Sequence, residues 1–453
     1  MAFHCSLQAD HARIKALHEA QIYFRTRECS ELVMKWGSGI FARQKVFTAQ
    51  ELLRWDLDAA ENVLALRMVR MPPKEARLKT YLLSRPKGGN FDSLQEILAI
   101  FSAGVVQLGA PMRGVAIYRV LVVINPYSGR RHANQVWQSV AEMFSLAGIE
   151  TDCHQTQHAG HARDILRECE LSLYNGVIAV GGDGTANEVL TGLLENSLNL
   201  ERGEGAPASP PFGIIAAGTD CTLAKFISST DPLAAARAII RGCEVRPMDL
   251  LQVQHGDEQR YSACGVGWGI PGHIARDSES LRKTFGVHRY TISLLKNLVH
   301  LNPVAGTVRI RPAIVDEEMK LKPCGPSCDI CSLPMGEMAG DREEEETVSG
   351  KFLFVACLKT EKTSCPFVHL ADGCLDAFLV EDLNLLDLAH LYLSMGPDGK
   401  HMDNGNFKHW KAKSVTIIPD DRSDHLNFDG EAGEGIGTTV SVLPRVCQVF
   451  FAQ

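Results

Sequence analysis

Short apolar runs alternate with amphipathic stretches in the middle of the chain. Arg119–Ile124 and Gly176–Val180 are continuous apolar runs, the pattern of strands buried on both faces of a parallel sheet. Glu150–Thr156 and Gly213–Ala217 supply two further strands. The helices expected between them start near Ala133, cover His158–Cys169 and run to about Leu194. This alternation predicts an open parallel sheet whose ligands bind beyond the carboxyl ends of its strands.

The two flanks of this region have a different pattern. Residues 1–113 show no βα alternation, and several strands followed by one helix are expected there. That outline fits a small β-sandwich of pleckstrin-homology type, and an unrelated α+β cap equally well. After about Val245 the strands lengthen, which predicts a mostly β domain with one helix around Arg289–His300. The N-terminal elements expected are strands at Ala20–Arg25, Glu31–Trp36, Val63–Met71 and Arg77–Leu83 and a helix from Ser93 to about Val105.

Length and charge narrow the class of protein. The 453 residues correspond to about three domains, and 45% hydrophobic with 22% charged residues is an ordinary globular composition. The net charge is −8, and residues 312–350 alone hold ten acidic and three basic residues. That segment is therefore an acidic insert, and the rest of the chain is nearly neutral. Without a basic footprint, nucleic acid is not an expected partner.

The number of cysteines and the hydropathy of the chain indicate which cellular compartment to expect for the protein. Fourteen cysteines are too dilute for a disulfide scaffold, and the first residues, MAFHCSLQAD, lack the pattern of a secretory signal. Reduced thiols in the cytosol are therefore expected. No apolar run reaches the roughly 18–20 residues of a membrane span.

Three of the predicted strands end in loops suited to phosphate. These loops are Asn125–Gly129, Gly181–Thr185 and Gly218-Thr219-Asp220. Glycines let backbone N–H groups approach an anion closely, and the following helix adds its positive N-terminus. Asp183, inside the second loop, could hold Mg²⁺ or accept a proton from a hydroxyl group. A Walker A pattern is absent, and no dinucleotide GxGxxG fingerprint follows the first strand.

These motifs resemble the diacylglycerol-kinase-type catalytic domain of lipid kinases, the group of sphingosine, ceramide and diacylglycerol kinases. The resemblance is strongest to ceramide kinases and spans roughly residues 119–453. The segments that carry it are Ile124–Gly129 (INPYSG), Gly181–Val189 (GGDGTANEV), Thr219-Asp220-Cys221, Asp277-Ser278-Glu279 and Lys322–Cys331 with its CxxxCxxC pattern.

The resemblance implies an α/β nucleotide-binding domain related to those of NAD kinase and diacylglycerol kinase, packed on a β-sandwich lipid domain. Residues 1–113 would form a pleckstrin-homology-like membrane-docking domain and residues 114–248 the ATP-binding domain. Residues 249–453 would form the lipid-substrate domain, with the acidic insert 312–350 and a C-terminal return segment.

The resemblance also implies which residues bind the nucleotide and Mg²⁺. Arg282 and Arg289 align with arginines that contact phosphate. Asp429-Gly430-Glu431 resembles the family's Asp-Gly-Glu beside the nucleotide and Mg²⁺. The remaining nucleotide residues would be Asn125, Gly129, Thr156, His161, Gly181, Gly182, Gly184, Thr185, Glu188, Gly218 and Thr219.

Two aspartates compete for the role of general base. Asp183 ranks first, and Asp372, in an Asp-Gly motif that bacterial relatives are thought to use, ranks second. Asp220, His273 and Asp277 are expected near the lipid head group. Sphingosine kinases carry acids where this chain has His273 and Ala275, and the absence of these acids argues against a free sphingoid amine and is compatible with the amide of ceramide. Ceramide kinases keep an acid at the position of His273, so this chain departs from their pattern there.

The cysteine triplet Cys324, Cys328 and Cys331 allows three interpretations. With Cys365 as fourth ligand it would form a structural Zn²⁺ site. Three thiolates could instead hold an iron–sulfur cluster, or the thiols could be free and redox-labile.

The sequence thus predicts an ATP- and Mg²⁺-dependent lipid kinase that phosphorylates the primary hydroxyl of ceramide, giving ceramide 1-phosphate. A cytoplasmic enzyme, peripheral on intracellular or plasma membranes, is expected. The alternatives are a sphingosine, long-chain-base or diacylglycerol kinase, an NAD kinase, and a catalytically weak membrane-binding protein.

Overall fold

A computed structural model describes most of the chain after residue 117 and the backbone of seven strands before it. The described part lies within residues 118–452 and omits the following: 130, 200–208, 219–220, 241–244, 286–291, 294–295, 298–300, 316–321, 326–327, 335–338, 343, 361–364 and 397–398.

The predicted parallel sheet is present. Its strands are β8 (Tyr118–Ile124), β9 (Ile149–Gln155), β10 (Gly176–Gly181) and β11 (Phe212–Ala216), in the spatial order β9-β8-β10-β11. All three pairings are parallel, with Ile124 beside both Val180 and Gln155. The carboxyl ends of the strands therefore share one edge of the sheet.

Helices cover both faces of this sheet because alternate strand residues point to opposite sides. Leu121 and Val123 pack in one core cluster, and Val120, Val122 and Ile124 pack in another. The first cluster includes residues of α3 (His161–Glu168), α4 (Asp183–Asn199) and α5 (Thr222–Ile227), and the second includes residues of α2 (Ala133–Leu146) and α6 (Pro232–Ile240).

The second half of the chain is a largely antiparallel β-sandwich, as predicted. Trp268 and Phe352 are fully buried in its core. The strands are β12 (Val245–His255), β13 (Glu258–Ser262), β14 (Gly265–Gly269), β15 (Val304–Ile314), β16 (Gly340–Asp341), β17 (Glu346–Leu358), β18 (Leu375–Glu381), β19 (Phe407–Pro419), β20 (His425–Phe428), β21 (Glu431–Glu434) and β22 (Thr438–Phe450).

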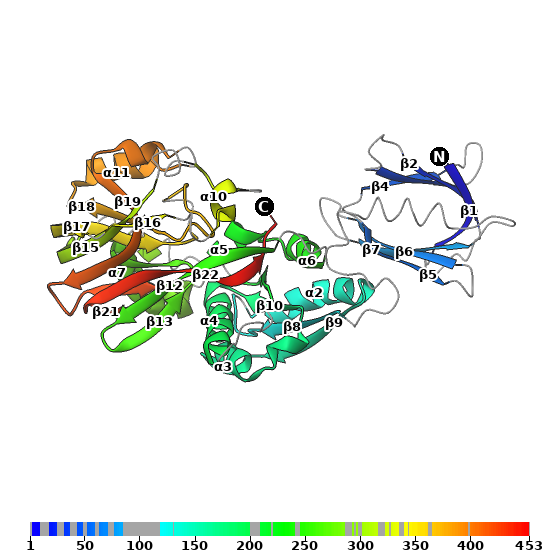
Figure 1. Ribbon diagram of the computed structural model, residues 1–453, viewed down its shortest axis with the longest axis horizontal. Helices are drawn as coiled ribbons and strands as arrows, with labels where there is room; N and C mark the ends of the chain where they lie inside the picture. The colour runs from blue at the N-terminus through cyan, green and yellow to red at the C-terminus, as the bar shows by residue number, and fades with distance from the viewer. Residues whose placement is uncertain are drawn as a thin grey trace.

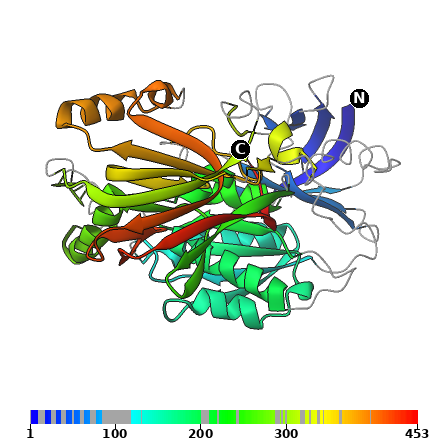
Figure 2. The same ribbon diagram turned by 60° about the vertical axis from the view of Figure 1, so that its left-hand side comes forward.

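The last strand joins the two halves. β22 pairs antiparallel with β12 and β19, and its Val449 lies beside Phe212 of β11 in parallel. One sheet therefore continues from the sandwich into the α/β region. Figures 1 and 2 show β22, in red, running from the sandwich toward the strands of the α/β layer.

Helices in this half differ from the prediction. The structure has α7 (Ile270–Phe285), α10 (Asp329–Ser332) and α11 (Leu385–Ser394), and α7 was not predicted. The helix expected around Arg289–His300 falls mostly outside the described residues. The expected insert 312–350 overlaps the end of β15 and the start of β17 and contains β16, so the connection between the two long strands is shorter than predicted.

The N-terminal region contains the four predicted strands and three more. Its strand order is β4-β3-β2-β1-β7-β6-β5, with every pairing antiparallel. The helix expected from Ser93 lies outside the described residues. The strands are β1 (Ala2–Ala9), β2 (His18–Phe24), β3 (Glu31–Trp36), β4 (Arg43–Thr48), β5 (Leu52–Asp58), β6 (Val63–Arg70) and β7 (Arg77–Ser84).

Candidate functional site

The three glycine-bearing loops meet at the carboxyl edge of the parallel sheet. The backbone N–H of Asn125 donates to the carbonyl of Val180 at 3.0 Å, and the N–H of Ala217 donates to Gly181 at 2.8 Å. The Asn125 side chain donates to Thr185 Oγ1 at 2.9 Å. The loops after β8, β10 and β11 are thus connected to one another, as the positions of the strands predicted.

Two of the glycines in these loops, at positions 129 and 184, lie in different structural settings. Gly129 adopts φ +58°, and a Cβ there would collide with the carbonyl oxygen of Ala217. Glycine is therefore required for the first loop to lie against the third. Gly184, in contrast, is exposed, and no atom lies within 4 Å of the position that a Cβ would take there. At Gly184 the protein leaves open space at the start of α4.

Asp183 is the first residue of α4, and its carboxylate is held by the start of α5. Backbone N–H groups of Thr222 and Leu223 each donate to it at 2.9 Å, and the Cys221 thiol donates at 3.4 Å. A carboxylate in the first turn of a helix is also stabilised by the helix dipole. These contacts fix the orientation of Asp183 at the loop that the sequence singled out.

Asp429 is the second carboxylate of this site. It occupies the two-residue turn between β20 and β21 with Gly430, and both residues have positive φ, as a type I′ turn requires. Its Oδ1 accepts from Ser262 Oγ and from the N–H groups of Cys264 and Gly265. Burial, together with the negative charge of Asp183, raises the pKa of Asp429 to about 6.

The thiol of Cys264 lies in the same electrostatic environment. Burial, and then the charges of Asp429 and Asp183, raise its pKa well above the usual value, so it is a neutral thiol. The carboxylates of Asp183 and Asp429 lie here, and none of the hydrogen bonds described above for them comes from a cation. The electrostatic potential of this region is therefore negative. Carboxylate oxygens at such a place are suited to Mg²⁺.

Asn187 connects the α/β region to the sandwich, a role the sequence reasoning missed. Its Nδ2 donates to the carbonyl of Tyr261 at 3.0 Å, and its Oδ1 accepts from the N–H of Ala263 at 3.1 Å. The signal was present, because Asn187 lies in the Gly181–Val189 motif. This amide holds α4 against the connection between β13 and β14, next to the hydroxyl and the two backbone N–H groups that hold Asp429.

Glu188, Thr156 and His161 form the neighbouring wall. Glu188 accepts from the N–H groups of Gly160 and Ala162 and so satisfies the first turn of α3. His161 Nδ1 accepts from the N–H of Gln157 at 3.0 Å. Thr156 is buried, and its N–H donates to the carbonyl of Ile124. Each of these residues shapes the loop between β9 and α3.

The remaining predicted nucleotide and head-group residues lie on the third loop, on β21 and on α7, or outside the described residues. Gly218 lies at the end of the third loop, where its N–H donates to Gly181 at 3.2 Å. Glu431 is exposed on β21, and Arg282 belongs to α7. Thr219, Asp220 and Arg289 lie outside the described residues.

His273 and Asp277 lie on α7 and are mostly buried. Asp277 accepts from Arg276 Nε at 3.0 Å and from Lys296 Nζ at 2.8 Å. Burial alone would raise the pKa of Asp277, but these two cations lower it overall. Burial, with the nearby Arg276, lowers the pKa of His273, which favours the neutral imidazole.

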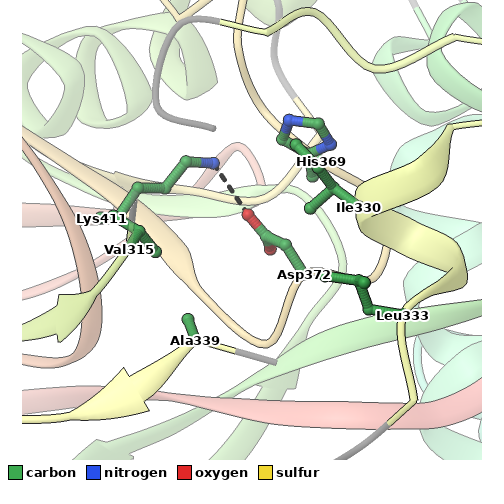
Figure 3. A pocket seen from close by; sticks show the side chains of 7 residues that line it. All are labelled: Val315, Ile330, Leu333, Ala339, His369, Asp372 and Lys411. Carbon is green, nitrogen blue, oxygen red and sulfur yellow. Dashed lines mark hydrogen bonds and ion pairs between the residues drawn. The ribbon is translucent and has the colours of Figure 1, made fainter. Parts of the chain in front are cut away.

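Asp372 is part of a buried ion-pair network, which makes it a poor general base. Lys359 Nζ and Lys411 Nζ each lie 2.9 Å from its carboxylate oxygens. Figure 3 shows the Lys411 ammonium directed at Asp372 in a small pocket. Burial alone would raise the pKa of Asp372, but the two lysines hold it well below its usual range.

The rest of this network was not predicted. Lys359 also pairs with Asp249 at 2.7 Å, and Lys411 also pairs with Asp376 at 2.8 Å. All four of these side chains are buried. No local pattern marks such residues, because the partners come from β12, β18 and β19 and from the residue that follows β17, and they meet only when the strands pair.

The cysteine triplet has a different fourth neighbour from the one predicted. Cys324, Cys328 and Cys331 lie together with His369, and the four ligand atoms are all within 4.8 Å of one another. Cys365 lies instead with Asp376 and His409. The prediction of Cys365 was wrong because the connection between β17 and β18 turns His369, and not Cys365, toward α10.

Among the described residues, no helix is long and apolar enough to cross a membrane.

Comparisons with known proteins agree with this architecture. Residues 119–253 match the family model of the diacylglycerol kinase catalytic domain, and residues 360–451 match that of the YegS C-terminal NAD kinase beta sandwich-like domain. A putative diacylglycerol kinase structure from Bacillus anthracis superposes with a TM-score of 0.52 at 19% identity, covering 75% of this chain and 98% of that one. The chain therefore carries the two-domain catalytic fold of the diacylglycerol-kinase type.

Within this class, the resemblance to ceramide kinases is confirmed. The human ceramide kinase is 34% identical over 58% of this chain and 54% of its own length, and the mouse ceramide kinase is 32% identical. Sphingosine kinase 1 of Arabidopsis thaliana is 27% identical over 73% of this chain and 69% of its own length. The chain spans about half the length of the ceramide kinases it matches.

Proposed function

We propose that the protein is an ATP-dependent lipid kinase that transfers the γ-phosphoryl group to the primary hydroxyl of ceramide, giving ceramide 1-phosphate. The observation that carries this proposal is the meeting of three glycine-bearing strand ends with the carboxylates of Asp183 and Asp429 where the α/β region joins the sandwich. A nucleotide on the loops would present its terminal phosphate at these two acids.

The loops would hold the phosphates through backbone N–H groups. The N-terminus of α4, a helix of 17 residues, adds a positive dipole at Gly184, where the space above the backbone is open. Gly182 and Gly218 approach each other closely on the same edge of the sheet. Arg282 and Arg289, placed by the family resemblance, would supply positive charge to the phosphates.

Asp429 and Glu431 are our candidates for holding Mg²⁺ with the phosphates. The oxygen-only donor set fits this hard cation. The raised pKa of Asp429 fits as well, since a nearby cation would stabilise its charged form. Bound Mg²⁺ would neutralise the charge that develops on the phosphoryl oxygens.

Asp183 is our candidate for the general base that takes the proton of the lipid hydroxyl. Its carboxylate is partly exposed and carries no ion pair in the described residues. Asp372 is bonded to two ammonium groups and to the N–H of Cys374, and the two cations lower the pKa of its carboxyl group and so weaken it as a base. Both acids accept three hydrogen bonds, but only Asp372 is paired with cations, and this contrast favours Asp183 as the general base.

Ceramide is favoured over sphingosine by the head-group residues and by the relatives. A free sphingoid amine needs an anionic partner, whereas His273 is a buried group whose neutral form is favoured. Asp277, the nearby acid, is already paired with Arg276 and Lys296. An uncharged amide would bind beside these groups without an unpaired charge. A sphingosine, long-chain-base or diacylglycerol kinase is the second candidate.

The N-terminal region would deliver the enzyme to its substrate. Its seven strands pair as one antiparallel sheet, with β1–β4 and β5–β7 joined through β1 and β7, and the pleckstrin-homology-like fold of this region is part of the proposal. We assign membrane docking to residues 1–113, nucleotide binding to 114–248 and the lipid substrate to 249–453. Cytoplasmic location and peripheral membrane association belong to the same proposal.

The test is a phosphoryl-transfer assay with labelled ATP and Mg²⁺. The purified full chain is given ceramide, sphingosine, diacylglycerol and NAD separately, with the lipids in vesicles. Label in ceramide supports the proposal. Label in sphingosine or diacylglycerol alone would retain the kinase and overturn the substrate. Label only in NAD, or in no acceptor, would overturn the lipid kinase.

Asp183→Asn is the matched variant for this assay. Loss of a general base lowers kcat by about 10²- to 10⁴-fold. The single amide oxygen can accept from only one of the two N–H groups at the start of α5, and the amide nitrogen faces the other, so the unfolding free energy should fall by about 1–2 kcal/mol. A folded variant that keeps full kcat would remove Asp183 from the catalytic role.

A further inference from the structure

We propose that Cys324, Cys328, Cys331 and His369 bind one Zn²⁺ ion in a tetrahedral Cys₃His site. The four residues are each at most 6% exposed. Three come from the connection between β15 and β17, and His369 comes from the connection between β17 and β18. The site lies apart from the proposed phosphate loops and does not depend on the proposed kinase function.

The distances between the ligand atoms are those that a zinc ion imposes. With Zn–S of about 2.3 Å and Zn–N of about 2.0 Å, tetrahedral geometry separates neighbouring ligand atoms by about 3.5–3.8 Å. The Sγ atoms of Cys324 and Cys331 are 3.7 Å apart. His369 Nδ1 lies 3.4 Å from Cys328 Sγ and 3.8 Å from Cys331 Sγ. These three distances match a single tetrahedral ion, and all four ligand atoms lie within 4.8 Å of one another.

The imidazole of His369 is oriented for metal binding by its other nitrogen. Nε2 lies 2.9 Å from the carbonyl oxygen of Lys322, and a carbonyl can only accept a hydrogen bond. Nε2 therefore carries a proton, and Nδ1 is the ring nitrogen that faces the cysteines, from which it would bind the ion. A hydrogen bond of this kind, from the outer nitrogen of a ligand histidine to a backbone carbonyl, accompanies most zinc–histidine sites.

Two alternatives for the cysteines fit less well. A disulfide between Cys324 and Cys331 would need an S–S distance of about 2.05 Å, whereas their sulfur atoms are 3.7 Å apart. It would also give no role to the contact between Cys328 and His369. An iron–sulfur cluster would hold its ligand sulfurs farther apart than one ion does, and it favours cysteine over histidine. The compact mixed set favours a single zinc ion.

The neighbouring group of Cys365, Asp376 and His409 provides an internal comparison. Its ligand atoms are also close together, but Lys411 Nζ lies 2.8 Å from Asp376. An ammonium already occupies the position next to this carboxylate, so a second cation there would be repelled. The Cys₃His group offers three sulfur ligands, and soft thiolates select zinc over harder cations.

The proposed ion would fasten an otherwise long connection to the sandwich. Arg246 Nη1 donates to the carbonyl of Gly325, and Arg445 Nη2 donates to the carbonyl of Cys331, so β12 and β22 hold the same segment. Ile330 and Leu333, on and after α10, then form one side of the pocket that contains Asp372 and Lys411 (Figure 3). The metal would thereby set the position of this pocket wall.

The experiment measures zinc in the purified full chain, kept reduced, by elemental analysis. One zinc per chain is expected for the natural protein. The variants Cys328→Ala and His369→Ala should lose most of the metal, and the controls Cys365→Ala and Cys153→Ala should retain it. Zinc that is absent from the natural protein, or that is lost from Cys365→Ala while His369→Ala keeps it, would overturn the proposal.

A second measurement avoids variants that fail to fold. The zinc of the natural protein is exchanged for Co²⁺, and the absorption spectrum is recorded. Intense visible ligand-field bands and a thiolate-to-cobalt charge-transfer band, with an intensity suited to three thiolates, are expected. A spectrum of octahedral Co²⁺ without the thiolate band, or a disulfide found among the three cysteines by mass spectrometry, would contradict a zinc site.

Discussion

The carboxylate of Asp372 illustrates how much a residue's role depends on its neighbours. Asp372→Asn removes the charge that both Lys359 and Lys411 contact. Because loss of one partner leaves buried ammonium groups incompletely paired, the unfolding free energy should fall by about 3–5 kcal/mol. The kcat per folded molecule should stay near that of the natural protein. Urea unfolding and kinetics of the same preparation measure both quantities.

Asp183→Asn is the natural partner of this experiment, because it should give the reverse result. It should lower kcat strongly and stability little. If Asp372→Asn instead reduced kcat by a hundredfold or more while the folded fraction was unchanged, the general base would be Asp372.

Asp429 makes a separate prediction about pH. Burial, the largest cause, raises its pKa in the folded state from 3.8 to about 6. The folded protein therefore binds this proton more tightly than the unfolded chain, and stability contributed by the proton is lost as pH rises from about 4 to 6. Relative to Asp429→Asn, the natural protein should lose up to about 3 kcal/mol across this window.

Urea unfolding at several pH values between 4 and 7 measures the effect. The exposed Asp257 supplies the control, since Asp257→Asn should leave the pH dependence of the natural protein unchanged. A difference between natural protein and Asp429→Asn that does not vary with pH would show that the carboxylate is not buried against its partners.

The sequence predicts those site residues that act through local motifs. Asp183 and the glycines of the three loops could be found because each follows a buried strand and starts a helix. His369 could not, since it follows Cys331 by 38 residues and reaches it only through the pairing of β17 and β18. Lys359 and Asp249 are likewise far apart in the chain, and no pattern in either segment indicates a buried ion pair.

At the scale of an element, the first phosphate loop depends on one backbone conformation. Gly129→Ala should both strain a residue at φ +58° and push against the carbonyl of Ala217. Gly160→Ala is the matched control, because Gly160 has φ +82° but leaves a Cβ free space. The control should lose about 1–2 kcal/mol from strain alone, and Gly129→Ala should lose more and should also weaken ATP binding.

Thermal unfolding and calorimetric titration with ATP separate the two effects. Equal losses of stability in both variants, with ATP binding intact, would mean that the contact between the first and third loops does not position the nucleotide.

Elements were predictable where their pattern was uniform. β8 and β10 are continuous apolar runs, and the structure places both at the centre of the parallel sheet. α7 was missed because Pro271 and Gly272 open it. Gly272 is explained by tertiary packing, since a Cβ there would collide with the carbonyl of His425 on β20. A contact made across the fold thus selects a residue that argues locally against a helix.

At the scale of the whole molecule, the described domains share their last strand. Val449 and Phe450 belong to core clusters of the α/β region, although β22 pairs along most of its length with sandwich strands. The family resemblance indicated a returning C-terminal segment. Its register beside β11 follows from long-range pairing that the sequence does not encode locally.

This shared strand predicts that the α/β region and the sandwich unfold as one unit. The Phe450 ring is 1% exposed and lies where Gly176 and Gly213 leave room for it. Phe450→Ala should lower the unfolding free energy by about 3–5 kcal/mol. Because the strand is common to both regions, the slowest-exchanging amides of β10 and of β17 should lose protection by the same amount.

Hydrogen exchange followed by mass spectrometry resolves peptides from β10 and β17 and so tests this coupling directly. Leu393→Ala is the control, because Leu393 is 82% exposed and its truncation should leave both strands unchanged. Protection lost from β10 alone would mean that the sandwich is stable without the α/β region. In that case the Asn187 contacts and β22 would connect two independent folding units, and the junction that carries Asp183 and Asp429 could open without unfolding either one.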